Sequence, residues 1–211
     1  MPWFAIVFSR VVAGAVLLGA AAIVTGCATR PMTTVEMTWV SPQLPQAPFK
    51  KLLIITVSYE EMVQIAFQDQ MAAALQARGI NAVASKRYFT RYTPEEKARF
   101  KQSIEESGAD FVLLARVTRF QLNERDDHYM TFGDATGLYT SWDRYASVAS
   151  AQNDFSVKTA SAEASIFAIQ SEKMIWSART RTANANVTTG EHFAELYVPV
   201  LLEAMKKDKL L

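Results

Sequence analysis

The chain has 211 residues, of which 50% are hydrophobic, and its 22 basic and 21 acidic side chains leave a formal net charge of +1. A near-neutral chain lacks the electropositive footprint of nucleic-acid-binding proteins, so we expect no nucleic acid partner. The length suits one domain with a sizeable core, and the single cysteine excludes an internal disulfide.

The first 26 residues have the pattern of a bacterial lipoprotein signal peptide. Arg10 is their only charged side chain, and the uncharged run over 11–25 is shorter than the roughly 20 residues of a spanning helix. The residues before Cys27 resemble a lipobox, with an aliphatic residue followed by two small ones: Val24, Thr25 and Gly26. The resemblance implies that the Cys27 thiol is diacylated, that residues 1–26 are cleaved off, and that the new amino terminus is acylated.

An uncleaved membrane anchor is the rival interpretation of this segment. It would place Arg10 inside the bilayer at a cost of about 2.5 to 3.5 kcal/mol, so the signal peptide is favoured. Ala28, rather than Asp, follows the cysteine, and by resemblance to enterobacterial sorting this implies the outer membrane. We expect no cofactor. The covalent lipid on Cys27 would make the membrane a partner.

Residues 27–50 contain four of the seven prolines, which predicts an extended tether between the lipid and a periplasmic domain over 51–211. Val35, Met37 and Trp39 alternate with polar residues inside this tether. That alternation indicates a short edge strand.

Two strand–helix–strand patterns follow. The apolar run 52–57 predicts a covered strand, Ser58 and Glu61 form a capping box for a helix that ends at Gly79, and residues 80–85 predict a second strand. A second helix starts at Thr93, Pro94 and Glu96 and ends at Gly108, and 111–122 is the third strand.

The last third predicts an antiparallel hairpin and a final helix. Alternation over 157–169 places small residues on one face of a strand, which suggests that a helix packs closely there. The second strand of the hairpin, 174–181, has Met174, Trp176 and Ala178 on one face. Thr188 and Glu191 form another capping box before an apolar stripe with helical spacing, within which Pro199 should kink the helix. The fold class is therefore α/β, with a mixed sheet of about five to six strands in the order β-α-β-α-β, then the β-β hairpin and a C-terminal helix, and with helices packed on the sheet.

Four passages resemble a group of small envelope lipoproteins. They are the lipobox, KKLLIITVS with ARGINAVAS, SGADFVLLARVTR, and EKMIWSARTRT before the last helix. The group's periplasmic domain is similar to the curli-secretion lipoprotein and to the N-terminal domain of the Tol-system translocation protein. This resemblance implies a fold and a location, and it assigns no activity.

A search for catalytic residues finds little. The chain has no cysteine besides Cys27, no G-x-S-x-G elbow and no glycine-rich phosphate loop. Its two imidazoles are His192, expected on the surface of the last helix, and His128 after two aspartates, where a metal ligand and a solvated loop are the alternatives. The solvated loop is favoured, so we expect neither an enzyme nor a metal site.

The segment 123–154 is long for a connection and rich in aromatic residues. These rings either fold back over the sheet or form a docking surface for another envelope protein. A pore is not expected, because the segment lacks sustained barrel-type alternation. Arginines along the third strand are further candidates for contact with an acidic partner, although regular geometry would separate them on two faces. The candidate partner-binding residues are Tyr139, Trp142, Tyr145, Arg116 and Arg119.

We therefore expect a lipid-anchored, non-catalytic protein at the periplasmic face of the outer membrane, acting as an accessory or assembly subunit through contacts with an unidentified envelope protein. The alternative is a lipoprotein that binds a small ligand or glycan in a pocket under the segment 123–154.

Overall fold

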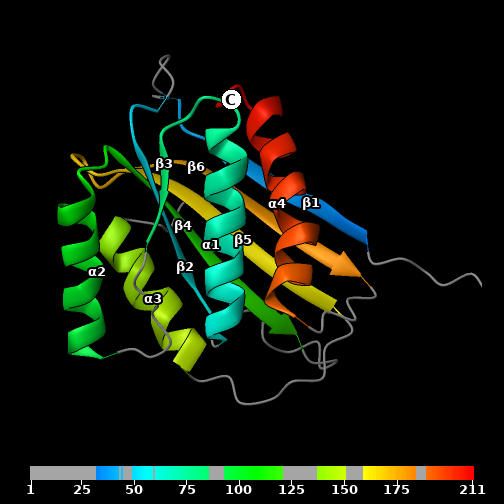
Figure 1. Ribbon diagram of the computed structural model, residues 1–211, viewed down its shortest axis with the longest axis horizontal. Helices are drawn as coiled ribbons and strands as arrows, with labels where there is room; N and C mark the ends of the chain where they lie inside the picture. The colour runs from blue at the N-terminus through cyan, green and yellow to red at the C-terminus, as the bar shows by residue number, and fades with distance from the viewer. Residues whose placement is uncertain are drawn as a thin grey trace, which may run out of the picture.

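The computed structural model describes residues 32–42, 44, 49–58, 60–85, 93–120, 137–150, 159–183 and 189–211. Within these ranges the chain forms six strands and four helices around one sheet (Figure 1). In chain order the elements are β1 (Met32–Val40), β2 (Leu52–Val57), α1 (Glu61–Gln76), β3 (Ala82–Ala84), α2 (Pro94–Ser107), β4 (Phe111–Phe120), α3 (Leu138–Ser150), β5 (Thr159–Ala168), β6 (Met174–Ala183) and α4 (Gly190–Lys207).

The sheet is mixed, with the strand order β1-β6-β5-β4-β2-β3. β2 runs parallel to both β3 and β4, whereas β4, β5, β6 and β1 form antiparallel neighbours. This arrangement confirms the predicted fold class and its hairpin. It results from crossover helices that return the chain to parallel strands, followed by a tight turn that reverses it.

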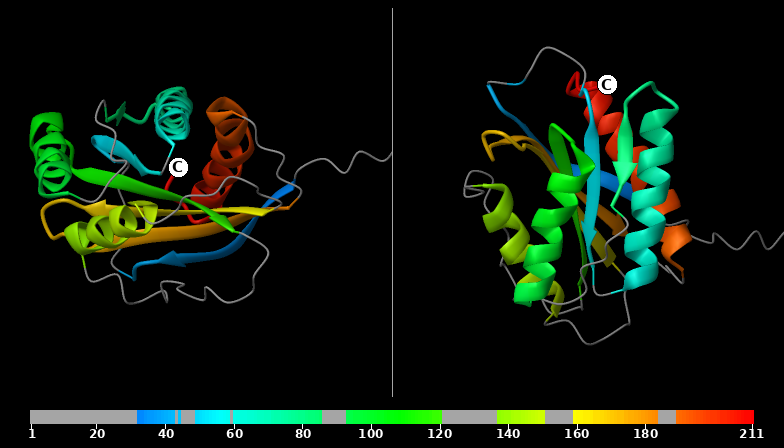
Figure 2. Two further views of the ribbon diagram at one scale, coloured as in Figure 1. Left: turned by 90° about the horizontal axis from the view of Figure 1, so that it is seen from below. Right: turned by 60° about the vertical axis from the view of Figure 1, so that its left-hand side comes forward.

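Helices cover both faces of the twisted sheet (Figure 2). α1 and α4 lie side by side on one face and bury the larger hydrophobic cluster, in which Phe193 stacks on Tyr197. The sheet contributes small residues to this cluster, namely Ala162, Ala164 and Ala178. Their size lets the helices approach the sheet closely, as the sequence predicted.

The second cluster lies on the opposite face, beneath α2 and α3. The ring of Phe100 from α2 stacks on Trp142 from α3, with the ring centroids 5.0 Å apart. α3 is a helix that the sequence analysis missed, because it treated all of 123–154 as an irregular connection. Residues 121–136 lie outside the described ranges.

Helix starts follow the predictions only in part. The hydroxyl of Thr93 accepts a hydrogen bond from the Glu96 N–H, which confirms that cap. The capping box at Ser58 was wrong: α1 starts after Glu60 with no side-chain cap, and the Ser58 hydroxyl accepts from the Glu60 N–H instead. The cap of α4 is Thr189, one residue later than predicted, and it accepts from the His192 N–H.

The edge strand predicted inside the tether is present as β1 and pairs with β6 along its length. The folded domain therefore includes residues 32–40, which the sequence analysis assigned to the tether. The predicted face of Met174 was also wrong, because the β5–β6 register shifts between Ile166 and Phe167. Met174 consequently packs against the cluster under α2 and α3, while Trp176 lies in the other cluster.

Candidate functional site

The lipobox residues Val24, Thr25, Gly26 and Cys27 lie outside the described ranges, and lipidation stays a prediction. His128 lies outside them as well. Where the helices are described, none is long and apolar enough to cross a membrane.

The structure places the aromatic candidates of α3 in the core. Trp142 is 0% exposed and Tyr145 is 1% exposed, whereas Tyr139 is only partly buried and packs edge-on against Phe100. The docking role suggested for Trp142 and Tyr145 is therefore wrong, because the second cluster needs these rings to cover the sheet. These rings also occupy the space beneath the described part of the segment 123–154, where the alternative interpretation placed a ligand pocket.

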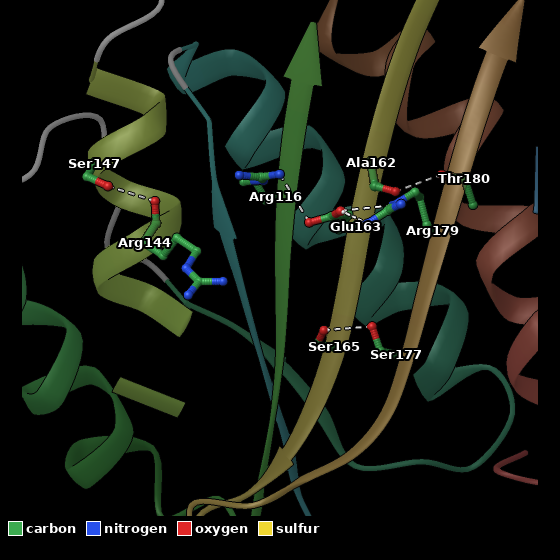
Figure 3. Close-up of polar contacts among 9 residues, drawn as sticks. All are labelled: Arg116, Arg144, Ser147, Ala162, Glu163, Ser165, Ser177, Arg179 and Thr180. Carbon is green, nitrogen blue, oxygen red and sulfur yellow. Dashed lines mark hydrogen bonds and ion pairs between the residues drawn. The ribbon is translucent and has the colours of Figure 1, made fainter. Parts of the chain in front are cut away.

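A buried charged cluster spans three adjacent strands on the same side of the sheet as α3 (Figure 3). Arg116 of β4 lies directly opposite Glu163 of β5, and Glu163 lies directly opposite Arg179 of β6. Side chains at directly opposed positions of neighbouring strands share one face. The strand order thus aligns two guanidinium groups on either side of one carboxylate.

Each oxygen of that carboxylate accepts from one arginine. Arg116 Nη2 donates to Glu163 Oε2 at 3.1 Å, and Arg179 donates to Oε1 through Nε at 3.0 Å and Nη2 at 2.9 Å. The three side chains are 8%, 9% and 11% exposed. Removing Glu163 would leave two buried guanidinium groups without a compensating charge, which is far costlier than the loss of a surface ion pair.

Tyr145 and a serine pair continue this polar patch. The Arg116 guanidinium lies over the Tyr145 ring, 5.0 Å from its centroid, in a cation–π contact. Ser165 donates to Ser177 at 3.0 Å on the same two strands that carry Glu163 and Arg179. Burial, reinforced by the negative charge of Glu163, raises the pKa of the Tyr145 hydroxyl to about 12.

The geometry of the cluster occupies the carboxylate of Glu163 fully. Both oxygens of Glu163 are engaged by guanidinium groups, so its carboxylate is poorly placed to act as a general base. Arg116 had been a candidate for partner contact, and its burial shows that this interpretation was wrong. Arg119 lies in β4 opposite Ala160, and its side chain is outside what the structure describes. Among the described residues, no group of His, Cys, Asp and Glu side chains is arranged to hold a metal.

A groove lies at the opposite side of the domain, between β1 and α4. Its volume is about 590 Å³. β1 is the outermost strand of the sheet, and within the described residues one of its two edges carries no neighbouring strand. The groove is lined by Val35, Glu36, Met37, Thr38, Pro199, Val200, Glu203, Ala204 and Lys207. Sequence reasoning missed this site, because it arises only when β1 joins the sheet beside α4.

Comparison with known proteins gives a distant likeness. No family model and no curated protein matches the chain. Among solved structures, the chain is similar to the PelC dodecamer from Paraburkholderia phytofirmans, with 15% identity and a TM-score of 0.43, covering 81% of this chain and 95% of that one. A variant of the same PelC dodecamer gives 16% identity and a TM-score of 0.43, covering 81% of this chain and 96% of that one.

The raised pKa of Tyr145 predicts a loss of stability in alkali. The pKa of the Tyr145 hydroxyl is about 12 in the folded state, whereas it is near 10.0 in the unfolded chain. Stability from this group is therefore complete below about pH 10 and declines up to about pH 12, by roughly 3 kcal/mol. Urea unfolding across this range should show a shallower decline for Tyr145→Phe than for the native chain.

Some alkaline sensitivity should persist in Tyr145→Phe, because burial also raises the pKa of Tyr197. Identical slopes for Tyr145→Phe and the native chain would show that the Tyr145 hydroxyl is solvated.

Proposed function

We propose that this chain is a lipid-anchored, non-catalytic envelope protein that acts as an accessory or assembly subunit through protein contacts at the periplasmic face of the outer membrane. The observation that carries the proposal is the lipobox, in which the only thiol of the chain follows Val24, Thr25 and Gly26 at the end of an apolar segment. The likeness to the curli-secretion and Tol-system domains is part of the same proposal.

The open edge of β1 and the groove beside α4 are the surfaces we assign to the protein partner. Met37 is 47% exposed on this edge. The register shifts between Val35 and Met37, and Glu36 forms an exposed ion pair with Arg181 at 3.8 Å. Bulges and charges on an edge strand suppress indiscriminate strand pairing, so this edge is suited to a specific partner.

Crosslinking in intact cells tests the partner contact. A photoreactive amino acid at Met37 should capture one recurrent envelope protein, identified by mass spectrometry, whereas the same group at Ala98 should capture none. Ala98 is a matched control because it is exposed on α2, across the sheet from the groove. Equal capture at both positions would contradict the assignment.

A small envelope ligand or glycan is the second candidate occupant of the groove. Its volume of about 590 Å³ falls within the roughly 300 to 1,000 Å³ typical of small-molecule sites. A thermal shift with glycan fragments that Val200→Trp abolishes, together with no crosslinked protein at Met37, would favour this candidate over the first.

Replacing the acyl acceptor tests the anchor. Cys27→Ser should abolish lipid attachment and block cleavage before residue 27, because the thiol is the group that is acylated. Membrane fractionation should find the variant unprocessed, with an intact mass that lacks the acyl chains. A native mature protein whose mass shows no acyl chains would refute the lipoprotein proposal.

A further inference from the structure

The backbone of β1 alternates between groups that bond to β6 and groups that face away from the sheet. At the end of this antiparallel ladder the Ser41 N–H donates to the Ile175 carbonyl oxygen at 2.9 Å. Alternate residues of an antiparallel strand direct their N–H and C=O groups to opposite edges. The odd-numbered residues of 37–41 therefore bond to β6, whereas Thr38 and Val40 direct these groups to the open edge.

A bulge carries this alternation toward the start of β1. The register shifts between Val35 and Met37, so Glu36 has no residue opposite it in β6. Because a bulge inserts one extra residue into one strand, Val35 is the next residue before Thr38 whose N–H and C=O groups face outward. Within the described ranges no strand pairs with these groups, since β1 ends the sheet. The edge from Val35 to Val40 thus offers backbone donors and acceptors to a neighbour.

The groove beside α4 lies next to these outward-facing groups (Figure 1). Thr38 lies opposite Ala178, which belongs to the cluster under α1 and α4, so both side chains share the face that α4 covers. The wall from α4 is apolar at Pro199, Val200 and Ala204. Side chains alternate between the faces of a strand, so a strand added to β1 directs every second side chain into this groove.

β1 also exposes apolar side chains on both faces of the sheet. It carries three of the five exposed large hydrophobic side chains of the described residues, namely Met32, Val35 and Met37. Val35 and Met37 lie opposite the consecutive residues Thr180 and Arg179, which point to opposite faces. A strand beside β1 therefore covers apolar surface on both of its faces, as an unprotected edge strand requires.

Charge and strand length argue against a second copy of the chain as the neighbour. A two-fold β1–β1 pairing centred on the groove would bring both bulges and both Glu36 carboxylates together, and like charges directly opposite are destabilising. Head-to-tail pairing would need the other edge of the sheet, where β3 has only three residues. The structure therefore favours an extended segment of a different protein.

The charges of the groove indicate which side chains the segment carries. Glu36 is paired with Arg181 at 3.8 Å, and Glu203 and Lys207 lie one helical turn apart in α4. The lining is thus electrically balanced around an apolar centre at Val200. It suits uncharged, apolar side chains, because a charged one would lose its hydration there without gaining a partner.

We propose that an extended segment of a different envelope protein pairs with β1 as a seventh strand of the sheet, with uncharged apolar side chains at alternate positions in the groove. Backbone hydrogen bonds to Thr38 and Val40 supply affinity, and the groove supplies specificity. The pairing rests on the proposed function, which assigns this surface to a protein partner.

Proline at an outward-facing position tests the strand pairing. Thr38→Pro removes the N–H that faces the open edge and keeps the bonds to β6, so an edge strand tolerates it. With a photoreactive amino acid at Met37 in intact cells, capture of the partner should fall about tenfold in Thr38→Pro, because a backbone donor is lost and the ring obstructs pairing. Thr38→Ala keeps the N–H and should leave capture unchanged. Urea unfolding measures whether both variants are folded, and undiminished capture by a folded Thr38→Pro would overturn the pairing.

Mapping the captured residues is a second measurement that needs no proline variant. Met32 and Met37 lie opposite Ala183 and Arg179, so photoreactive groups at the two methionines stand four ladder positions apart. That separation is roughly 13 Å at about 3.3 Å per position. Mass spectrometry should find the two captured partner residues about four apart in one segment, whereas a helix covers roughly 13 Å with about nine residues. A spacing of about nine residues, or capture in unrelated segments, would rule out an added strand.

The outcomes separate the strand pairing from the function on which it rests. A photoreactive group at Met37 that captures no protein refutes the assignment of this surface to a protein partner. Capture of a second copy of the chain, seen as a crosslinked dimer, or of a partner that Thr38→Pro does not weaken, refutes the added strand alone.

Discussion

Trp176→Ala should lower the free energy of unfolding by about 3 to 5 kcal/mol, the usual cost of emptying a large buried site. Trp176 is 0% exposed in the cluster formed with α1 and α4. Its indole Nε1 also donates to Asp208 Oδ2 at 2.8 Å, at the C-terminal cap of α4. The truncation thus removes both the packing of the ring and the hydrogen bond to the C-terminal end of α4.

Urea or guanidinium unfolding measures this loss of stability. Two further variants separate the contribution of the hydrogen bond from that of ring packing. Asp208→Ala removes the hydrogen bond and leaves the ring, so its cost should be about 1.5 to 3 kcal/mol, as for bonds to charged groups. Trp176→Phe keeps much of the apolar surface and should fall between the native chain and Trp176→Ala. A loss below about 1 kcal/mol for Trp176→Ala would place the indole in solvent.

The periodicity of apolar residues was sufficient to predict most of the fold. The β-branched run Leu52–Val57 and the alternation of β5 and β6 favoured strands, and Gly108 ends α2 in a left-handed conformation as expected for a helix terminus. These signals are local, because each depends on which face of one element is buried. Helix caps were predicted less well, since neighbouring Ser and Thr residues compete for the same backbone N–H groups.

α3 was missed although its signal is present in the sequence. Leu138, Trp142 and Tyr145 recur at i, i+4 and i+7 and are all buried. The preceding glycines and the length of the connection suggested an irregular loop, and the docking hypothesis followed from that choice. Testing the helical period across the segment would have assigned these rings to the core.

The charged cluster was beyond prediction from the sequence. Arg116, Glu163 and Arg179 come from three strands, and they meet only because β5 lies between β4 and β6 in a particular register. A shift of one residue would turn Glu163 to the other face of the sheet. Glu163 was therefore never a candidate residue, and Arg116 was considered together with Arg119 of the same strand.

The inclusion of β1 in the sheet shortens the tether expected from the sequence. The prolines of residues 27–50 indicated a flexible spacer, yet residues 32–40 pair with β6. Under the proposed lipidation of Cys27, only residues 28–31 would separate the lipid from β1, so the anchor would hold the folded domain close to the membrane.

Glu163→Gln should destabilise the fold by about 3 to 5 kcal/mol, as is typical when one partner of a buried ion pair is lost. The substitution keeps the shape of the side chain and removes the only negative charge that the structure places between Arg116 and Arg179. The two guanidinium groups would then repel each other across β5 in surroundings that water cannot easily screen. Chemical denaturation should detect a lower midpoint with an unchanged slope.

Two controls show whether charge is the cause. Glu203→Gln removes an exposed carboxylate and should change stability by less than about 0.5 kcal/mol. Replacing all three members together, Arg116→Met, Glu163→Leu and Arg179→Met, should recover much of the loss, because an apolar cluster of similar volume needs no compensating charge. If Glu163→Gln costs no more than Glu203→Gln, the arginines must be solvated. If the triple variant is no more stable than Glu163→Gln, the cluster contributes through specific hydrogen bonds that fix the register of β4, β5 and β6.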